Sequence, residues 1–198
     1  IIYIMMEGRY TMFFYEIETE RLRLKNISYE DREFILSEFS NDSINRYLFD
    51  AEPLNSLEEA DELISFYLQP EPRMQHRWIL ILKNSNTKIG TCGFHCWDES
   101  KKCVDIGYDL QEEYWGQGLV PEAAQLLIQH CFENLQLTGL WCCHYHGNIQ
   151  SKRVQEKLGF IYHHTCQDVE VPLMNEIRVG HTNYMTKERW ETIAIEKR

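Results

Sequence analysis

The sequence lacks the positive charge of a nucleic-acid-binding protein. Its 198 residues include 20 Lys and Arg against 31 Asp and Glu, which gives a formal net charge of −11. Binding to phosphate backbones requires a net basic face, so this balance argues against a nucleic-acid partner. An acidic protein is instead suited to a cationic substrate, although net charge does not locate the charges.

The sequence also lacks a long hydrophobic run and a regular cysteine framework. The longest apolar run, Ile1 to Met6, is far shorter than the roughly 20 residues of a membrane span and is not followed by the features of a signal peptide. The seven cysteines are odd in number and lack the regular spacing of a secreted disulfide domain. We therefore expect a cytoplasmic protein with no membrane partner.

No tract rich in Gly, Pro and Ser and no internal repeat divides the chain. The first regular pattern appears only after Met12, and the chain begins with Ile. We expect residues 1–16 to be an N-terminal extension or an expression remnant, and residues 17–198 to form a single domain.

Hydrophobic periodicity predicts an alternation of strands and helices. Strands are predicted at 19–26, 78–82, 89–97, 103–110, 139–145, 160–165 and 181–185. Helices are predicted after Ser28, after Ser56, after Gly118, over 149–158 and from Lys187. The expected fold class is α/β of the mixed α+β kind, with hairpins early and strand–helix units late.

The segment Trp115-Gly116-Gln117-Gly118 joins a predicted strand to a predicted helix. Glycines there allow a tight turn and remove β-carbons that would block a ligand, while the free N–H groups of the first helical turn favour an anion. The same glycines could simply satisfy the geometry of a turn. A dinucleotide fingerprint is excluded, since its third glycine would stand at Pro121, and no Gly-x-x-x-x-Gly-Lys-Ser/Thr loop is present.

A second informative segment, from Asn148 to Phe160, follows the glycine-containing segment further along the chain. The informative segments are Thr19–Leu24, Ile89-Gly90, Gly93-Phe94, Ile106–Tyr108, Tyr114–Gly118, Glu122-Ala123, Asn148-x-x-Ser151-x-Arg153-Val154 and Glu156–Phe160. In this order and spacing they resemble the GNAT superfamily of acetyl-CoA-dependent N-acetyltransferases. Within it the sequence is similar to the RimJ/RimL-like branch of ribosomal-protein N-terminal acetyltransferases.

This resemblance implies a twisted mixed sheet of about seven strands flanked by helices, in which the strands through Tyr108 and Cys142 splay apart. Acetyl-CoA is the implied co-substrate. The resemblance places its pantetheine arm along the backbone of Ile106, Tyr108 and Leu110. It places the pyrophosphate on the amides of Trp115, Gly116, Gln117, Gly118 and Leu119. Relatives often carry a cation at the position of Glu113, so one phosphate contact is missing here.

The resemblance also suggests roles in the second segment. Asn148 maps to a residue that bonds the pantetheine arm, although asparagine also caps helices well. Ser151 is placed to reach the sulfur of acetyl-CoA as an acid, or is simply solvated. Many relatives have an acidic tyrosine at the position of Gln155, so Ser151, a water or a tyrosine from elsewhere would have to protonate the leaving thiolate.

The acceptor amine needs a base, because only an unprotonated amine attacks a thioester. Asp105 occupies a position that relatives often fill with glutamate, and it is the candidate base; the alternative is a solvated or salt-bridged strand residue. His95 and Trp97 follow at the end of the neighbouring strand. They are candidates for lining the acceptor site, or for packing in the core.

A metal site is not expected. Cys142, His144 and His146 would share one face of a strand, but ligands at such spacing extend over about 13 Å, too far to converge on one ion. The predicted function is direct transfer of an acetyl group to a protein N-terminal α-amine. The alternatives are a small cationic amine, such as a polyamine or aminoglycoside, or an inactive CoA-binding sensor. The assembly state stays open, with a homodimer as one option.

Overall fold

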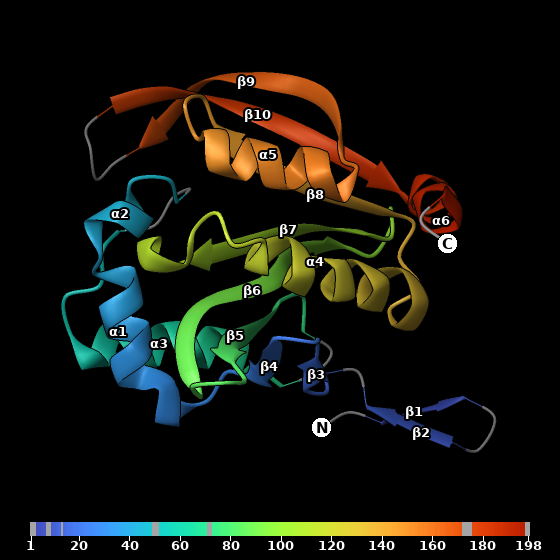
Figure 1. Cartoon of the computed structure of the whole chain (residues 1–198). Helices are drawn as coiled ribbons and strands as arrows, with labels where there is room; N and C mark the ends of the chain where they lie inside the picture. The colour runs from blue at the N-terminus through green and yellow to red at the C-terminus, as the bar shows by residue number, and fades with distance from the viewer. Residues whose placement is uncertain are drawn as a thin grey trace.

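A computed structural model of the chain describes residues 3–6, 9–12, 14–48, 52–70, 73–171 and 176–196 (Figure 1). Of residues 3–6 and 9–12 and of positions 168, 170 and 171 only the backbone is described. The expected extension at 1–16 lies partly outside these ranges; within them, β1 (Tyr3–Met6) and β2 (Arg9–Met12) form a separate two-stranded hairpin. The packing of the main core begins at Phe14, which is buried and stacks on His76.

The other strands form one mixed sheet of eight, in the order β3-β4-β5-β6-β7-β8-β10-β9. They are β3 (Ile17–Glu18), β4 (Leu22–Asn26), β5 (His76–Leu82), β6 (Thr87–Asp98), β7 (Cys103–Leu110), β8 (Gly139–Tyr145), β9 (Ile161–Val171) and β10 (Glu176–Thr186). Neighbouring strands are antiparallel except β7 and β8, which are parallel. The predicted fold class is confirmed, with eight strands in place of about seven.

Helices cover both faces of this sheet (Figure 1). The helical segments are η1 (Tyr29–Asp31), α1 (Arg32–Phe39), α2 (Asp42–Asn45), α3 (Leu57–Tyr67), η2 (Glu112–Tyr114), α4 (Leu119–Gln129), the π-helical turn η3 (His130–Asn134), α5 (Ile149–Leu158) and α6 (Lys187–Glu196). No helix in the described ranges has the length and apolar character to span a bilayer.

Strand β5 shows why both faces are covered. Trp78 and Leu80 belong to the larger core, which includes the buried face of α4, whereas Ile79 and Ile81 belong to a smaller core with α1 and α3. Successive side chains of a strand point to opposite faces, so a strand buried on both sides has a continuous apolar sequence. The run at 78–82 is such a sequence.

The ends of the helices follow the capping residues. Oδ1 of Asn148 accepts the N–H of Ser151 at 3.0 Å and starts α5, and Gly159, at φ +98°, ends it. Ser56 caps α3 in the same way. An asparagine or serine cap satisfies one of the free amides of the first turn, and a left-handed glycine stops the last.

The parallel strands β7 and β8 separate after a short ladder. Only three residue pairs join them, from Cys103 with Gly139 to Asp105 with Trp141. Both strands continue past this point, and β8 then pairs only with β10. The predicted splayed pair is therefore present, and it opens one side of β7 to a ligand.

Candidate active site

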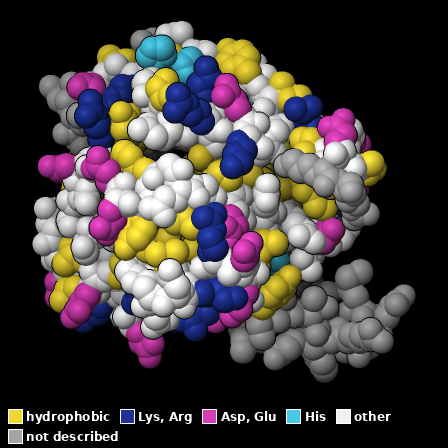
Figure 2. Space-filling model, viewed as in Figure 1, with side chains coloured by type: hydrophobic (Ala, Val, Ile, Leu, Met, Phe, Trp, Pro, Cys, Tyr) yellow, Lys and Arg dark blue, Asp and Glu magenta, His cyan; other side chains and the backbone are white. Residues whose placement is uncertain are grey.

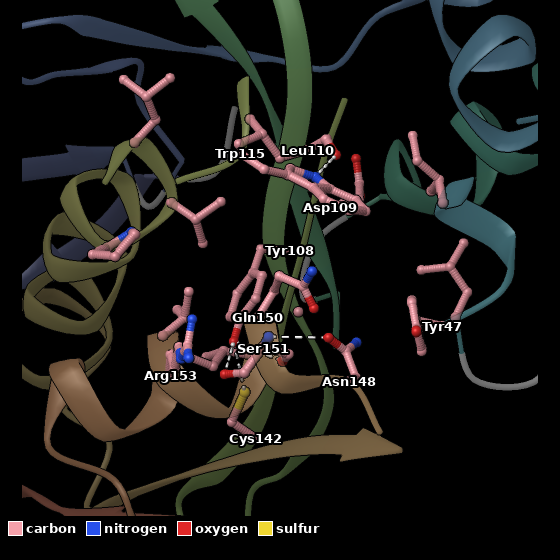
Figure 3. A pocket seen from close by; sticks show the side chains of 18 of the residues that line it. Tyr47, Tyr108, Asp109, Leu110, Trp115, Cys142, Asn148, Gln150, Ser151 and Arg153 are labelled. Atoms are coloured by element: carbon pink, nitrogen blue, oxygen red, sulfur yellow. Dashed lines mark hydrogen bonds between the residues drawn. The ribbon is translucent and has the colours of Figure 1, made fainter. Parts of the chain in front are cut away.

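A cleft of about 730 Å³ opens where β7 and β8 diverge (Figure 3). Eleven of the thirteen site residues expected from the sequence line it, and Gln117 and Trp97 do not. Those that line it are His95, Asp105, Ile106, Tyr108, Leu110, Trp115, Gly116, Gly118, Leu119, Asn148 and Ser151. The fold thus brings together residues that are more than 50 positions apart in the chain.

The alternation of β7 divides the cleft into two sides. The Tyr108 hydroxyl meets Ser151 of α5, while Asp109 points the other way, toward the side of Tyr47 that follows α2 (Figure 3). Asp105 shares the face of Asp109, since both are odd-numbered residues of one strand. We refer to these as the α5 side and the α2 side of the cleft.

The loop before α4 has the conformation expected of an anion cradle. Gly116 and Gly118 have φ values of +73° and +75°, a left-handed conformation that favours glycine, and Gly118 begins α4 without a side-chain cap. Within the described part of the chain, the N–H groups of Gly116, Gln117 and Gly118 have no acceptor. The N–H of Trp115 already donates to the Glu112 carbonyl at 3.1 Å, so this amide is not free for a phosphate.

A network from the N-terminal strands holds this loop in place. Arg21 donates from Nη1 to the carbonyl of Gln117 at 3.0 Å and from Nε to the Glu122 carboxylate at 2.6 Å. Thr19 donates its hydroxyl to the same carboxylate. Burial opposes ionisation of Glu122, but the hydrogen bonds from Thr19 and Arg21 outweigh it and lower the pKa of Glu122. These residues belong to the segments that carried the resemblance, and the structure gives them a positioning role that sequence reasoning missed.

Helix α5 supplies positive charge near the loop. Arg153 and Lys157, one helical turn apart, both line the cleft, and neither forms an ion pair with any residue that the structure describes. Lys157 Nζ lies 3.9 Å from the position that a β-carbon on Gly118 would take. Figure 2 shows Lys and Arg side chains over this region, between α5 and α4. These cations can replace the one that is missing at Glu113.

Two hydroxyl groups meet on the α5 side. Ser151 Oγ lies 3.0 Å from the Tyr108 hydroxyl, and Cys142 Sγ lies 4.0 Å from the same hydroxyl (Figure 3). Burial raises the pKa of Tyr108 well above its ordinary value. The tyrosine is therefore a hydrogen-bond donor at neutral pH and a poor source of a free proton. The sequence left open a tyrosine from elsewhere as the acid; Tyr108 is a tyrosine beside Ser151, but its raised pKa suits hydrogen-bond donation rather than proton transfer.

Gln155 orients Ser151. It is 1% exposed, and its amide nitrogen donates to Ser151 Oγ at 3.1 Å and to the carbonyl of Cys143 at 3.1 Å. Its oxygen accepts from Asn183 and lies 3.1 Å from Nδ1 of His144. Every polar atom of this side chain is thus hydrogen-bonded, and the glutamine fixes the serine hydroxyl in place.

Asp105 lies on the α2 side beside His95, its partner across the β6–β7 ladder. Burial raises the pKa of Asp105, and none of the ion pairs in the described ranges includes it. Burial and the charge of Arg77 lower the pKa of His95, which keeps its imidazole neutral. An unpaired carboxylate with a raised pKa can accept a proton from a substrate.

Trp97 packs in the core rather than in the cleft. Its ring meets Phe94 edge-on, with centroids 5.9 Å apart. In a regular strand these residues would face opposite sides, but the pairing of β6 and β7 shifts register after His95, and Cys96 has φ +52°. The bulge reverses the alternation, so Cys96 lines the cleft in place of Trp97.

A buried charge network lies at the base of the α2 side. Arg77 donates to Asp109 at 3.0 Å and to Thr91 Oγ1 at 2.6 Å, and the Thr91 amide donates to Asp109 at 2.9 Å. Burial, together with the charge of Asp109, raises the pKa of the fully buried Glu38. Glu38 is therefore neutral and Asp109 is already paired. Sequence reasoning missed this network, because it joins residues from four segments of the chain, α1, β5, β6 and β7.

Comparison with known proteins places the chain in a family. The family profile described as "Acetyltransferase (GNAT) domain" matches residues 21–161. An uncharacterized N-acetyltransferase of Bacillus subtilis, YoaA, is 31% identical over 145 residues, covering 73% of this chain and 81% of that protein. An uncharacterized N-acetyltransferase of Bacillus licheniformis, p20, is 29% identical over 153 residues, covering 77% and 85%.

Solved structures share the fold at low sequence identity. A spermidine N-acetyltransferase from Vibrio cholerae, in complex with CoA and spermine, matches with a TM-score of 0.78 at 17% identity, covering 87% of this chain and 99% of that one. The ribosomal alpha-N-protein acetyltransferase RimL, in complex with coenzyme A, matches with a TM-score of 0.79 at 17% identity, covering 87% and 98%. The chain belongs to the GNAT family, and it is an acetyl-CoA-dependent N-acetyltransferase.

Proposed function

We propose that the protein transfers the acetyl group of acetyl-CoA directly to the α-amine at the N-terminus of a protein or peptide. The RimJ/RimL-like branch is the group whose sequence segments it resembles, and RimL is among the structures of the same fold. One observation carries the choice of acceptor: the α2 side offers a single unpaired carboxylate, that of Asp105.

The charges on this side fit an acceptor with one amine. Asp105 and Asp109 are the only acids among the described residues that line the cleft, and Asp109 is paired with Arg77. A polyamine carries several ammonium groups, each of which needs a carboxylate or another acceptor. Ile44, Tyr47 and Leu48 line the same cleft and supply apolar surface, which suits the first side chain of a peptide.

The pKa of the acceptor also favours an α-amine. An α-amino group titrates near about 8, whereas an alkyl amine such as that of lysine titrates near about 10.4. A carboxylate such as that of Asp105, whose pKa burial raises, can take the proton of an α-amine, directly or through water, at a smaller free-energy cost than the proton of an alkyl amine.

The groups that bind acetyl-CoA would act mainly by holding its thioester in position for attack by the amine. Bound acetyl-CoA supplies an activated acetyl thioester. The free amides of Gly116 to Gly118, with Arg153 and Lys157, would hold its diphosphate, and the unpaired edge of β7 would hold its pantetheine arm. A backbone N–H near Tyr108 would stabilise the oxyanion.

The hydroxyls of Ser151 and Tyr108 would donate hydrogen bonds to the departing sulfur. Because the pKa of Tyr108 is raised by burial, we infer stabilisation of the thiolate by hydrogen bonding and its later protonation from solvent. Asn148 would both cap α5 and contact the pantetheine arm, since it lines the cleft while its Oδ1 binds the Ser151 amide.

The test is an acceptor screen read by mass spectrometry. We expect peptides with a free N-terminal Ala or Ser to gain one acetyl group on the α-amine, and the same peptides with a blocked N-terminus and an internal lysine to gain none. Spermidine and an aminoglycoside should react at least about ten-fold more slowly by kcat/KM, a difference of about 1.4 kcal/mol. Faster transfer to spermidine would reject the peptide acceptor, and CoA binding without turnover across the whole panel would favour an inactive sensor.

A further inference from the structure

The end of β6 places three metal-ligating groups on the α2 side of the cleft. The imidazole of His95, the thiol of Cys96 and the carboxylate of Asp105 each have one ligand atom within 4.8 Å of those of the other two. All three line the cleft, and His95 and Asp105 face each other across the ladder. Nitrogen, sulfur and oxygen donors therefore converge at one point on the wall of the cleft.

The bulge in β6 creates this cluster. In a regular strand His95 and Cys96 would point to opposite faces, so no sequence pattern with period two would place them together. The left-handed φ of Cys96 and the register shift after His95 turn the thiol to the side of the imidazole. A residue with a β-carbon seldom adopts this conformation, and bulges occur often beside functional sites.

We propose that His95, Cys96 and Asp105 bind a thiophilic divalent cation of the Zn²⁺ type, with one coordination position open to the cleft. Zinc bonds of about 2.0–2.3 Å put neighbouring ligand atoms roughly 3.5 Å apart in a tetrahedron. Side-chain rotation can close a separation of 4.8 Å to this value. Cys96 is exposed and His95 half-buried, so the ion can reach them from the cleft.

The chemistry of the three ligands suits this class of ion. Thiolate and imidazole together favour zinc-like metals over Mg²⁺ or Ca²⁺, which prefer oxygen ligands. On binding, the Cys96 thiol would lose its proton to solvent and the sulfur would bond to the metal. No metal site was expected from the sequence, because the candidate ligands there were Cys142, His144 and His146. The bulge that brings His95 and Cys96 together cannot be predicted from the sequence pattern.

An ion at this position would also occupy Asp105 and stop acetyl transfer. This consequence depends on the proposed role of Asp105 as the base, whereas ion binding itself does not. Ion binding can be tested separately from the role of Asp105 by measuring it in the absence of both acetyl-CoA and the acceptor amine.

Binding is tested on the full chain, freed of metal by a chelator and titrated with Co²⁺ as a spectroscopic probe of the zinc site. We expect a thiolate-to-cobalt absorption in the near ultraviolet that saturates at one ion per chain and disappears when Zn²⁺ is added. Cys96→Ser should abolish it, and Asp105→Asn should weaken Co²⁺ binding by at least about ten-fold. Unchanged CoA binding, on the other side of the cleft, would show that each variant is folded.

Cys166→Ser is the matched control. Cys166 lies on β9 with its sulfur 3.3 Å from Nε2 of His164, and this variant should keep the full absorption. Absence of the band in the unaltered chain, its persistence in Cys96→Ser, or its loss in Cys166→Ser would overturn the proposal.

The inhibitory consequence has its own readout. Zn²⁺ should inhibit turnover of the unaltered chain, and at least about ten-fold more Zn²⁺ should be needed for Cys96→Ser. Binding at this site without inhibition would contradict Asp105 as the base while supporting the ion site. A chain that acetylates nothing but still shows the Cys96-dependent band would reject the proposed function and support the ion site.

Discussion

The cradle before α4 makes a quantitative prediction for Gly118. Its φ of +75° lies in the left-handed region, which costs an L-residue about 1–2 kcal/mol. A β-carbon there would lie 3.8 Å from Arg21 Nη2 and 3.9 Å from Lys157 Nζ, which is ordinary contact. The effect of Gly118→Ala therefore comes from backbone strain and not from a clash. If the free loop relaxes and ligand binding must restore it, the Kd for CoA rises about 5- to 30-fold.

Calorimetric titration with two ligands checks this reasoning. CoA carries the diphosphate, whereas pantetheine lacks it, so Gly118→Ala should weaken CoA alone. Gly118→Asn is the matched control, because asparagine adopts the left-handed conformation more readily, and we expect its CoA affinity to fall much less. Equal losses for CoA and pantetheine, or an unchanged Kd in Gly118→Ala, would refute the placement of the diphosphate on these amides.

Three further substitutions test other parts of the site. Ser151→Ala should lower kcat about ten-fold with little change in CoA affinity, since it removes one hydrogen bond of about 1.5 kcal/mol to the leaving sulfur. The steady-state rate of CoA release measures kcat, and an unchanged kcat would contradict a role of Ser151 at the leaving sulfur. Asp105→Asn should show its largest loss of activity at low pH and a small loss at high pH, where the amine is already unprotonated. A loss of the same size at every pH would indicate that Asp105 binds the acceptor and does not act as the base. For Glu38→Gln the readout is stability against pH. Burial raises the pKa of Glu38 in the folded state, so its neutral form stabilises the fold below the unfolded pKa near 4.5, and this contribution is lost as pH rises toward the folded value. Urea unfolding should therefore show the variant gaining stability relative to the unaltered chain as pH rises from about 5 to 8; a constant difference would mean that Glu38 is ionised.

Local chemistry made part of this structure predictable from the sequence. Asn148 and Gly159 mark the ends of α5, and both are residues with a strong intrinsic preference for those positions. The strand β8 was predicted with its observed bounds, Gly139–Tyr145, because its apolar pattern lies between clear breaks. The splayed pair came from the resemblance alone, since no local pattern shows which strands are neighbours.

Other features depend on contacts that no local pattern contains. Glu38 and Asp109 are 71 positions apart, and their coupling follows from α1 packing against the sheet. The position of Trp97 was open for another reason. The sequence offered either the acceptor site or the core for His95 and Trp97 together, but one extra residue in the bulge separates them and turns Trp97 to the core. A bulge is an insertion in the pairing, and it becomes visible only when the partner strand is known.

The proposed position of the pantetheine arm in the gap between β7 and β8 would give the co-substrate a mechanical role. Three ladder pairs join the half of the sheet that ends in β7 to the half that begins with β8, and a pantetheine arm in the gap would act as an additional strand. Beyond the three ladder pairs, the gap between the two halves would then be bridged only while the thioester or its product is bound, and every product release would open it again. Amide hydrogen exchange along residues 106–110 should accordingly slow when CoA is present and recover when it is removed.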